Sequence, residues 1–252
     1  MVKPTAASDN VRAEWRARIA AEYGSAAITQ HLTLWLIQVG ASPELIDDGL
    51  RIVKDELEHA RLSNEVYVAA GGTAPPALDR ANLGLYRRES VPLELDLLRA
   101  SIQIFALGET VAVPLFKHLR EGTTVPTARV ALDRVLRDEV RHRDFGWTLL
   151  DWFLTTPLAP DVPAIVAAEL PAMFAGLERN YGQADFGAGK GVAPEKPEAA
   201  AAPPPFDAAD RAWGLAPAHE YAGILERTFA RDYLPRFQAR GIDPTDAWAH
   251  RR

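Results

Sequence analysis

Four long stretches of helical periodicity, each bounded by helix start and stop signals, constrain the fold of this chain most. Strand signals are scarce, and each predicted helix is roughly 28 to 32 residues long, more than twice the usual length. The second stretch shows the signals well, because Ser42 is a good cap, Pro43 suits the first helical position, and Gly71 is a typical stop. Pro114 predicts a kink within the third stretch. The predicted helices cover about residues 9–40, 43–71, 92–122 and 126–157.

The connections between these stretches favour one arrangement. The turns after the first and third helices are only a few residues long, so each of these helices should pack antiparallel to the one that follows it. The middle connection has about 20 residues and can span more than about 60 Å, which is enough to run the length of a bundle. We therefore predict an all-α four-helix bundle with a long crossover between its second and third helices.

The chain divides into two regions on this reading. Residues 1–157 form the predicted bundle, and residues 158–252 form a C-terminal helical extension. Within the extension we expect a helix at about 161–181, a Pro/Ala-rich linker at about 183–206, and a last amphipathic helix at about 216–240. The extension is expected to pack on the bundle, with a lid or an oligomer contact as alternatives.

Two short motifs carry the chemical signal. Residues 55–59 read DELEH and residues 138–142 read DEVRH, so both have the form D-E-x-x-H. A glutamate and a histidine three residues apart lie on the same helix face, about one turn from each other. Glu56 and His59 can therefore bind one metal ion together, as can Glu139 and His142. A carboxylate can also bridge two ions, which an imidazole cannot.

Two isolated carboxylates complete the pattern. Glu22 is the only formally charged residue from Ile19 to Pro43, and Glu109 is the only one from Ser101 to Phe116. A carboxylate in so apolar a stretch must be solvated, protonated, paired or bound to a metal. The simpler alternative is that each reaches water on the outer face of its helix.

The positions of these residues along their helices agree. Each lies roughly 20 to 27 Å from the turn of its own hairpin, at about 1.5 Å per residue, so all should meet near the middle of the bundle. Four carboxylates and two imidazoles suit two divalent ions such as iron or manganese, and the chain has no cysteine to supply thiolates. The predicted metal ligands are Glu22, Glu56, His59, Glu109, Glu139 and His142.

Over about residues 10–156 the sequence resembles the ferritin-like di-iron carboxylate superfamily, which includes rubrerythrins and di-iron oxygenases. The family pattern is a glutamate followed by D-E-x-R-H, repeated once. The motif at 138–142 matches this pattern fully, whereas the motif at 55–59 has Glu58 in place of the arginine. The resemblance implies the crossover topology and a dinuclear iron site that reacts with dioxygen or peroxide.

The resemblance also implies individual roles. The four glutamates named above would be the catalytic metal ligands, with Glu56 and Glu139 as the bridging ones. Asp55 and Asp138 would each orient an imidazole from across the site through its free ring N–H, and Arg141 would hold one of these aspartates. The alternative for each aspartate is an ordinary contact with the histidine of its own helix.

The function that follows is a non-haem di-iron oxidase or oxygenase that activates O2 to oxidise a small organic substrate. A rubrerythrin-like peroxidase or a ferroxidase is the alternative, and a metal-free helical scaffold is a third. The expected cofactors are two iron ions, with manganese or a mixed manganese–iron pair as alternatives. Small residues near the ligands would leave space for oxygen and substrate or permit close helix packing; these are Gly24, Ser25, Ala26, Ala106, Gly108 and Ala112.

Charge and hydropathy limit the partners. The net charge of −6 does not indicate nucleic-acid binding. No uninterrupted apolar run reaches transmembrane length, and the N-terminal sequence MVKPTAASDN lacks the apolar core of a signal peptide, so we expect a cytoplasmic protein without membrane contact. The expected partners are O2 or peroxide, an unidentified small molecule and an electron donor, and a homodimer is left open.

Overall fold

The computed structural model describes residues 7–182 and 206–251, and within these ranges the chain is helical and contains no strand. The predicted all-α class is therefore confirmed. A π-helical segment, η2 (Ser101–Glu109), joins α3 to α4 without a break. The long helices are α1 (Asp9–Gln38), α2 (Pro43–Ala69), α3 (Leu93–Ala100) continued by α4 (Thr110–Gly122), and α5 (Pro126–Phe153).

Several helix ends follow the local signals in the sequence, although Ser42, at the N-cap of α2, makes no side-chain capping hydrogen bond. The hydroxyl of Ser8 accepts a hydrogen bond from the backbone N–H of Val11 at 3.1 Å and so caps the start of α1. The chain leaves α1 and α2 through Gly40 and Gly71, whose φ angles are +71° and +86°. Glycine adopts this left-handed conformation without the steric cost that a Cβ would add, which is why both helices end there.

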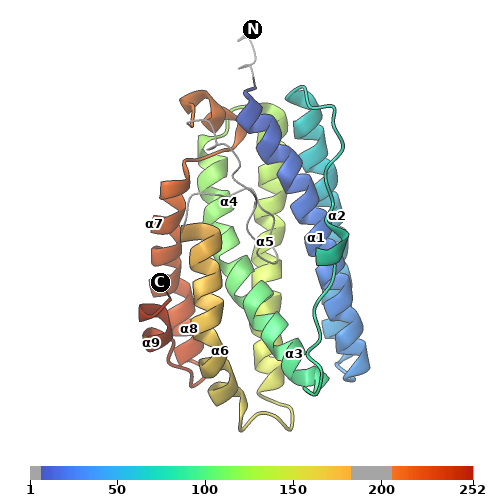
Figure 1. The fold of residues 1–252 in the computed structure, drawn as a ribbon, viewed down its shortest axis with the longest axis vertical. Helices are drawn as coiled ribbons and strands as arrows, with labels where there is room; N and C mark the ends of the chain where they lie inside the picture. The colour runs from blue at the N-terminus through green and yellow to red at the C-terminus, as the bar shows by residue number, and fades with distance from the viewer. Residues whose placement is uncertain (1–6, 183–205, 252) are drawn as a thin grey trace.

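The long helices pack lengthwise around a common core. Helix α1 lies against α2, α5 lies against η2 and α4, and α2 lies against α5 (Figure 1). The connection from Ala70 to Pro92 runs along the length of the molecule before α3 begins (Figure 1). It is attached to α1 midway, where the N–H of Leu85 donates to Nδ1 of His31 at 3.0 Å. The connection therefore makes α2 and the α3–α4 stretch point in the same direction.

The third long helix differs from the sequence expectation at one place. Pro114 lies inside α4, and the irregularity is the nine-residue π-helix η2, which ends shortly before the proline. A proline inside a helix removes a backbone hydrogen bond and crowds the carbonyl four residues before it, here that of Thr110, but residues 110–113 are α-helical, so the proline does not by itself account for η2. The buried Tyr233 hydroxyl donates to the backbone carbonyl of Leu107 at 2.6 Å and so stabilises η2.

The C-terminal part packs beside the long helices (Figure 1). The two helices predicted at about 161–181 and 216–240 are present, the second as α7, η5 and α8 in succession. A 3-10 segment, η4, and a short last helix, α9, were not predicted. The predicted linker at about 183–206 lies outside the described residues except for Phe206. The elements are α6 (Val162–Leu177), η3 (Glu178–Gly182), η4 (Ala208–Trp213), α7 (Ala218–Thr228), η5 (Phe229–Tyr233), α8 (Leu234–Gln238) and α9 (Thr245–Ala249).

Specific contacts attach the C-terminal part to the long helices. The indole N–H of Trp15 in α1 donates to the carbonyl of Trp213 at 2.9 Å. Glu220 in α7 forms an ion pair with His118 of α4 and accepts a hydrogen bond from Arg211 at 2.7 Å. The hydrogen bond from Arg211, together with His118, lowers the pKa of Glu220 to about 2. The carboxylate therefore stays charged at neutral pH and holds α7 against α4.

One described helical stretch, Leu93–Gly122, is long and apolar enough to cross a membrane. Of its most apolar window, 67% is buried inside the fold. This burial is typical of the core helix of a soluble protein, and a cytoplasmic location stays a prediction.

Candidate metal centre

The six predicted ligands come from four different helical segments and meet in the interior. Glu22 lies on α1, Glu56 and His59 on α2, and Glu109 at the end of η2. Glu22 and Glu109 are each only 2% exposed, so neither reaches solvent on the outer face of its helix. The other four, including Glu139 and His142 from α5, are completely buried.

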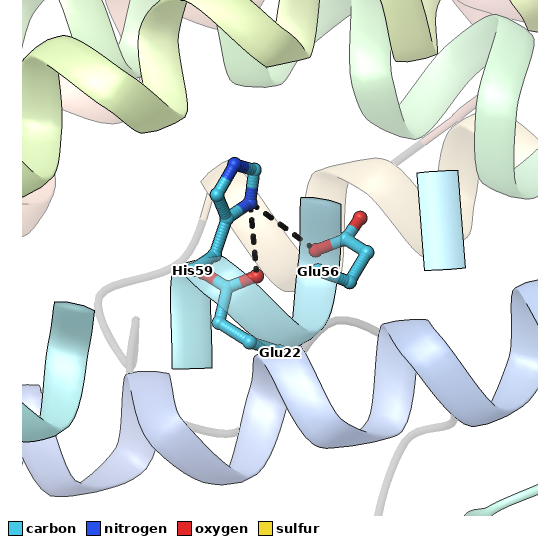
Figure 2. Close-up of side chains that lie close together, drawn as sticks. All are labelled: Glu22, Glu56 and His59. Atoms are coloured by element: carbon cyan, nitrogen blue, oxygen red, sulfur yellow. Dashed lines mark ion pairs between the residues drawn. The ribbon is translucent and has the colours of Figure 1, made fainter. Parts of the chain in front are cut away.

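Glu22, Glu56 and His59 form the first cluster, and one nitrogen or oxygen atom of each lies within 4.8 Å of the others. The Nδ1 atom of His59 is 3.4 Å from Oε2 of Glu56 and 3.8 Å from Oε2 of Glu22. Figure 2 shows this ring nitrogen pointing toward both carboxylates, while the other ring nitrogen points away. The geometry places three potential ligand atoms around one position.

Glu109, Glu139 and His142 form the second cluster, with the same 4.8 Å limit. Nδ1 of His142 is 3.7 Å from Oε2 of Glu139 and 3.4 Å from Oε1 of Glu56. Glu56 therefore lies between the imidazoles of both clusters, whose ring centres are 5.7 Å apart. The two clusters form one continuous centre, and the bridging roles expected of Glu56 and Glu139 stay predictions.

Two aspartates each contact one imidazole, at the ring nitrogen that points away from the glutamates. Nε2 of His59 is 3.2 Å from Asp138, and Nε2 of His142 is 3.4 Å from Asp55. Each contact crosses from one hairpin to the other, rather than staying within one helix. A carboxylate can only accept, so we assign the proton to Nε2 in both rings. Neither Nδ1 atom has a hydrogen-bond partner within the described part of the chain, and each faces the glutamates, where its lone pair becomes available to a metal ion once the proton there is lost.

Arginines in turn hold the two aspartates. Arg141 contacts Asp55 at 2.6 Å and Asp138 at 3.1 Å. Arg134 contacts the same pair, forming an ion pair with Asp138 and lying 3.3 Å from Asp55. Sequence reasoning missed Arg134, although it lies one helical turn before Asp138 and on the same face. Glu58, which takes the place of Arg141 in the first motif, pairs with Arg61 and interacts with Arg134 of this network only through its charge.

Ser25 was also missed as an orienting residue. Its hydroxyl donates to Oε1 of Glu56 at 2.8 Å, and the side chain is buried. From the sequence, Ser25 was identified only as a small residue near the predicted ligands. The available signal was its position three residues after Glu22, which places it on the same face of α1.

The charges in the centre change the affinity of the imidazoles for protons. Burial alone would lower the pKa of His59, but the hydrogen bond to Asp138 and the nearby Glu56 and Glu22 outweigh it and raise the pKa to about 10. The pKa of His142 is likewise raised well above its usual value against the effect of burial. Two imidazolium ions balance half of the charge of four carboxylates. A divalent ion that displaces each proton from Nδ1 would balance the charge more completely.

The donor set fits a pair of hard or borderline divalent cations. It consists of carboxylate oxygens and imidazole nitrogens, which suit iron, manganese and zinc, and it contains no thiolate. Buried carboxylates carry a desolvation cost that cations at this position would offset. The two buried clusters can therefore hold metal ions.

A cavity opens beside the centre, between α1, η2 and the α6–η3 stretch. Its volume is about 670 Å³ when the open solvent at its mouth is included. Glu109 of the second cluster and Ser25, which contacts Glu56, both line it. A small molecule in the cavity would therefore lie next to the metal ligands.

No protein-family model matches this sequence, and no curated protein is significantly similar to it. The assignment to the ferritin-like di-iron carboxylate superfamily thus stays a prediction that rests on the motifs and on the geometry of the six side chains.

Proposed function

We propose that the protein is a non-haem di-iron oxidase or oxygenase, which uses O2 to oxidise a small organic substrate. The observation that carries this proposal is the position of Glu56 between two imidazoles, His59 and His142, at the centre of four buried glutamates. This arrangement supplies two neighbouring sets of ligands that share one carboxylate. Two such sets favour a pair of ions that can act on one molecule together.

Each hairpin would hold one ion. Glu22 and His59 would bind the first, Glu109, Glu139 and His142 would bind the second, and Glu56 would contact both. When bound, two ferrous ions supply electrons for the activation of O2, and a pair containing manganese is the alternative. The four glutamates match the charge of two divalent ions, which favours binding at a buried position.

The residues around the ligands keep them in position and limit their contact with bulk water. Asp138 and Asp55 fix the ring orientation and hold the proton on Nε2, so Nδ1 stays available. The Ser25 hydroxyl orients Glu56. Complete burial of Glu56 and Glu139 excludes bulk water from the ligands.

The cavity favours an organic substrate over iron storage or peroxide removal. It gives a molecule larger than O2 access to Glu109, and the lining is largely apolar. Iron handling and peroxide reduction need no such space. An electron donor would also be required for turnover.

The experiment loads the metal-free chain with ferrous iron without oxygen, measures iron per chain, and then follows O2 uptake on mixing with air. We expect two irons per chain and rapid O2 uptake. Glu139→Ala should lose both properties, whereas Glu58→Ala, at the surface in the neighbouring motif, should keep them. A Glu139→Ala variant with full iron content and O2 uptake would refute the proposal. Consumption of peroxide without O2 uptake would favour the peroxidase alternative.

A further inference from the structure

Apolar side chains form part of the wall of the cavity beside the metal centre. Ile28 of α1, Ile104 of η2, and Met173 and Leu177 of α6 line it with apolar side chains. Gly176 of α6 also lines it and leaves room, because a Cβ at this position would meet nothing closer than 3.7 Å. Burying the apolar surface of a ligand against such walls lowers the free energy, so the cavity favours apolar ligands.

The charge of the cavity lining should discriminate between ligands more strongly than its apolar character does. Among the described residues that line the cavity, none is a lysine, arginine or histidine, and the only charged one is Glu109. In the metal-free chain, a carboxylate or phosphate that entered would lose its hydration without gaining a cation from the lining. It would also approach the buried carboxylate of Glu109, which has the same sign. The cavity therefore disfavours anions on two separate grounds.

The mouth of the cavity is polar but uncharged. Gln103 and Asn180 line the cavity and are exposed, whereas Glu109 and Ser25 lie at its buried end. The two carboxamides can each donate and accept hydrogen bonds, so they can contact a hydroxyl, carbonyl or amide group of a ligand. Arg179 lies outside the lining, with a guanidinium nitrogen 3.7 Å from where a Cβ of Gly176 would be.

We propose that this cavity binds an uncharged, largely apolar organic molecule and discriminates against the corresponding carboxylate. Calling that molecule the substrate rests on the proposed function. The binding preference itself rests only on the lining. The apolar body would lie between α1, η2 and α6 with its polar end toward Gln103 and Asn180, so that its far end reaches the vicinity of Glu109.

Met173 offers a direct probe of occupancy. The chain has only two methionines, Met1 and Met173, and Met173 lines the cavity. Protein with ¹³C-labelled methionine methyl groups therefore gives one signal from the cavity and one internal control. Two matched pairs of ligands are titrated, 1-octanol against octanoate and benzyl alcohol against benzoate. Each titration is done on the metal-free chain and on the chain loaded with zinc, which is diamagnetic.

We expect the Met173 signal to shift with at least one of the two alcohols, and the matching carboxylate to bind at least about tenfold more weakly, equivalent to about 1.4 kcal/mol. Gly176→Leu adds a large side chain at a lining position and should abolish the shift. Gly24→Leu is the matched control, because its Cβ would meet nothing within 4 Å and Gly24 does not line the cavity. Arg179→Gln should change neither affinity by more than about twofold.

The proposal is overturned if a carboxylate binds as tightly as its alcohol, if neither alcohol shifts Met173, or if Gly176→Leu folds and leaves binding intact. If Gly176→Leu does not fold, the Met173 and Met1 signals of the unmodified chain still decide the first two outcomes. Failure of the proposed function is seen separately. A chain that binds the alcohol but no iron would retain the cavity preference and lose the di-iron assignment.

Discussion

The hairpin of α1 and α2 and the hairpin of α3–η2–α4 and α5 supply the same ligands at the same depth but are built differently around them. The first hairpin is regular α-helix throughout, whereas the second contains the π-helix η2 directly before Glu109. The second motif carries Arg141, which holds both aspartates, whereas the first carries Glu58, which turns to the surface.

The difference separates two tasks. The parts that can hold cations are repeated almost identically, as expected if each ion needs its own glutamates and imidazole. The parts that admit a ligand are not repeated. The cavity is lined by α1, η2, α6 and η3, and among the predicted metal ligands it includes Glu109 of the second hairpin but not Glu22 of the first. The two hairpins therefore supply similar candidate metal ligands, but they differ in how a small molecule could reach those ligands.

The largest expected effect separates the shared ligand from an unshared one. Glu56→Ala removes the carboxylate between His59 and His142, so we expect metal content to fall from two ions per chain to nearly none. Glu22→Ala should retain one ion, in the second hairpin. Affinity at a site that loses its glutamate should drop more than about 100-fold, since loss of an outer partner alone costs about 10- to 100-fold. Elemental analysis after equilibrium dialysis measures both. Two ions retained by Glu56→Ala would show that the hairpins act independently.

A smaller effect tests whether the two halves are equally supported. Asp138→Asn and Asp55→Asn each replace the acceptor for one ring N–H, of His59 and His142 respectively. Each should weaken binding of one ion by about 10- to 100-fold and leave the other ion in place. Competition against a chelator gives the two affinities. Asp133→Asn, at an exposed position paired with Arg120, is the control and should change neither. Equal weakening of both ions by one substitution would contradict the cross-hairpin pairing.

The π-helix can be loosened from outside the centre. Tyr233→Phe removes the hydrogen bond to the carbonyl of Leu107 in a fully buried position, which should cost about 1–3 kcal/mol of unfolding free energy. Amide hydrogen exchange should accelerate in residues 101–109 and stay unchanged in α1 and α2. Tyr221→Phe, whose contact with Ala216 is 3.4 Å long, should cost less. Acceleration spread evenly over both hairpins would argue against a local role.

The smallest effect concerns the position at which the two motifs carry opposite charges, Glu58 and Arg141. Arg141→Gln leaves Asp55 and Asp138 with Arg134, so the loss should be about 1 kcal/mol or less, because the side chain is 39% exposed and solvent screens it. Glu58→Gln should be neutral within about 0.5 kcal/mol. Chemical denaturation of both variants measures the difference. A larger loss of unfolding free energy for Glu58→Gln than for Arg141→Gln would contradict the assignment of Arg141 as the residue that supports the aspartates.

The features that depend on local sequence patterns could be predicted from the sequence. Helix limits followed from caps and glycines, as at Ser8, Gly40 and Gly71. The ligand set followed from charges isolated in apolar helices and from a spacing that fixes two side chains on one face. The partners of Glu56 and Asp138 were not accessible in the same way. Ser25 and Arg134 are common residue types whose roles depend on which helix they face.

The π-helix and its support show a second limit. Pro114 indicated an irregularity, but a proline alone does not distinguish a kink from an extra residue per turn in the preceding segment. Tyr233 lies far along the chain from Leu107, and its hydroxyl reaches η2 only because α7, η5 and α8 pack beside the long helices. Contacts between distant segments of this kind leave no periodic signal in the sequence.

Anomalous X-ray scattering from crystals grown with ferrous iron tests the central claim most directly. We predict two peaks within about 3.5–4 Å of each other, the separation usual for two-metal sites, with Glu56 between them and one histidine Nδ1 beside each. A single peak, or metal only at surface carboxylates with the six buried side chains unchanged, would contradict it.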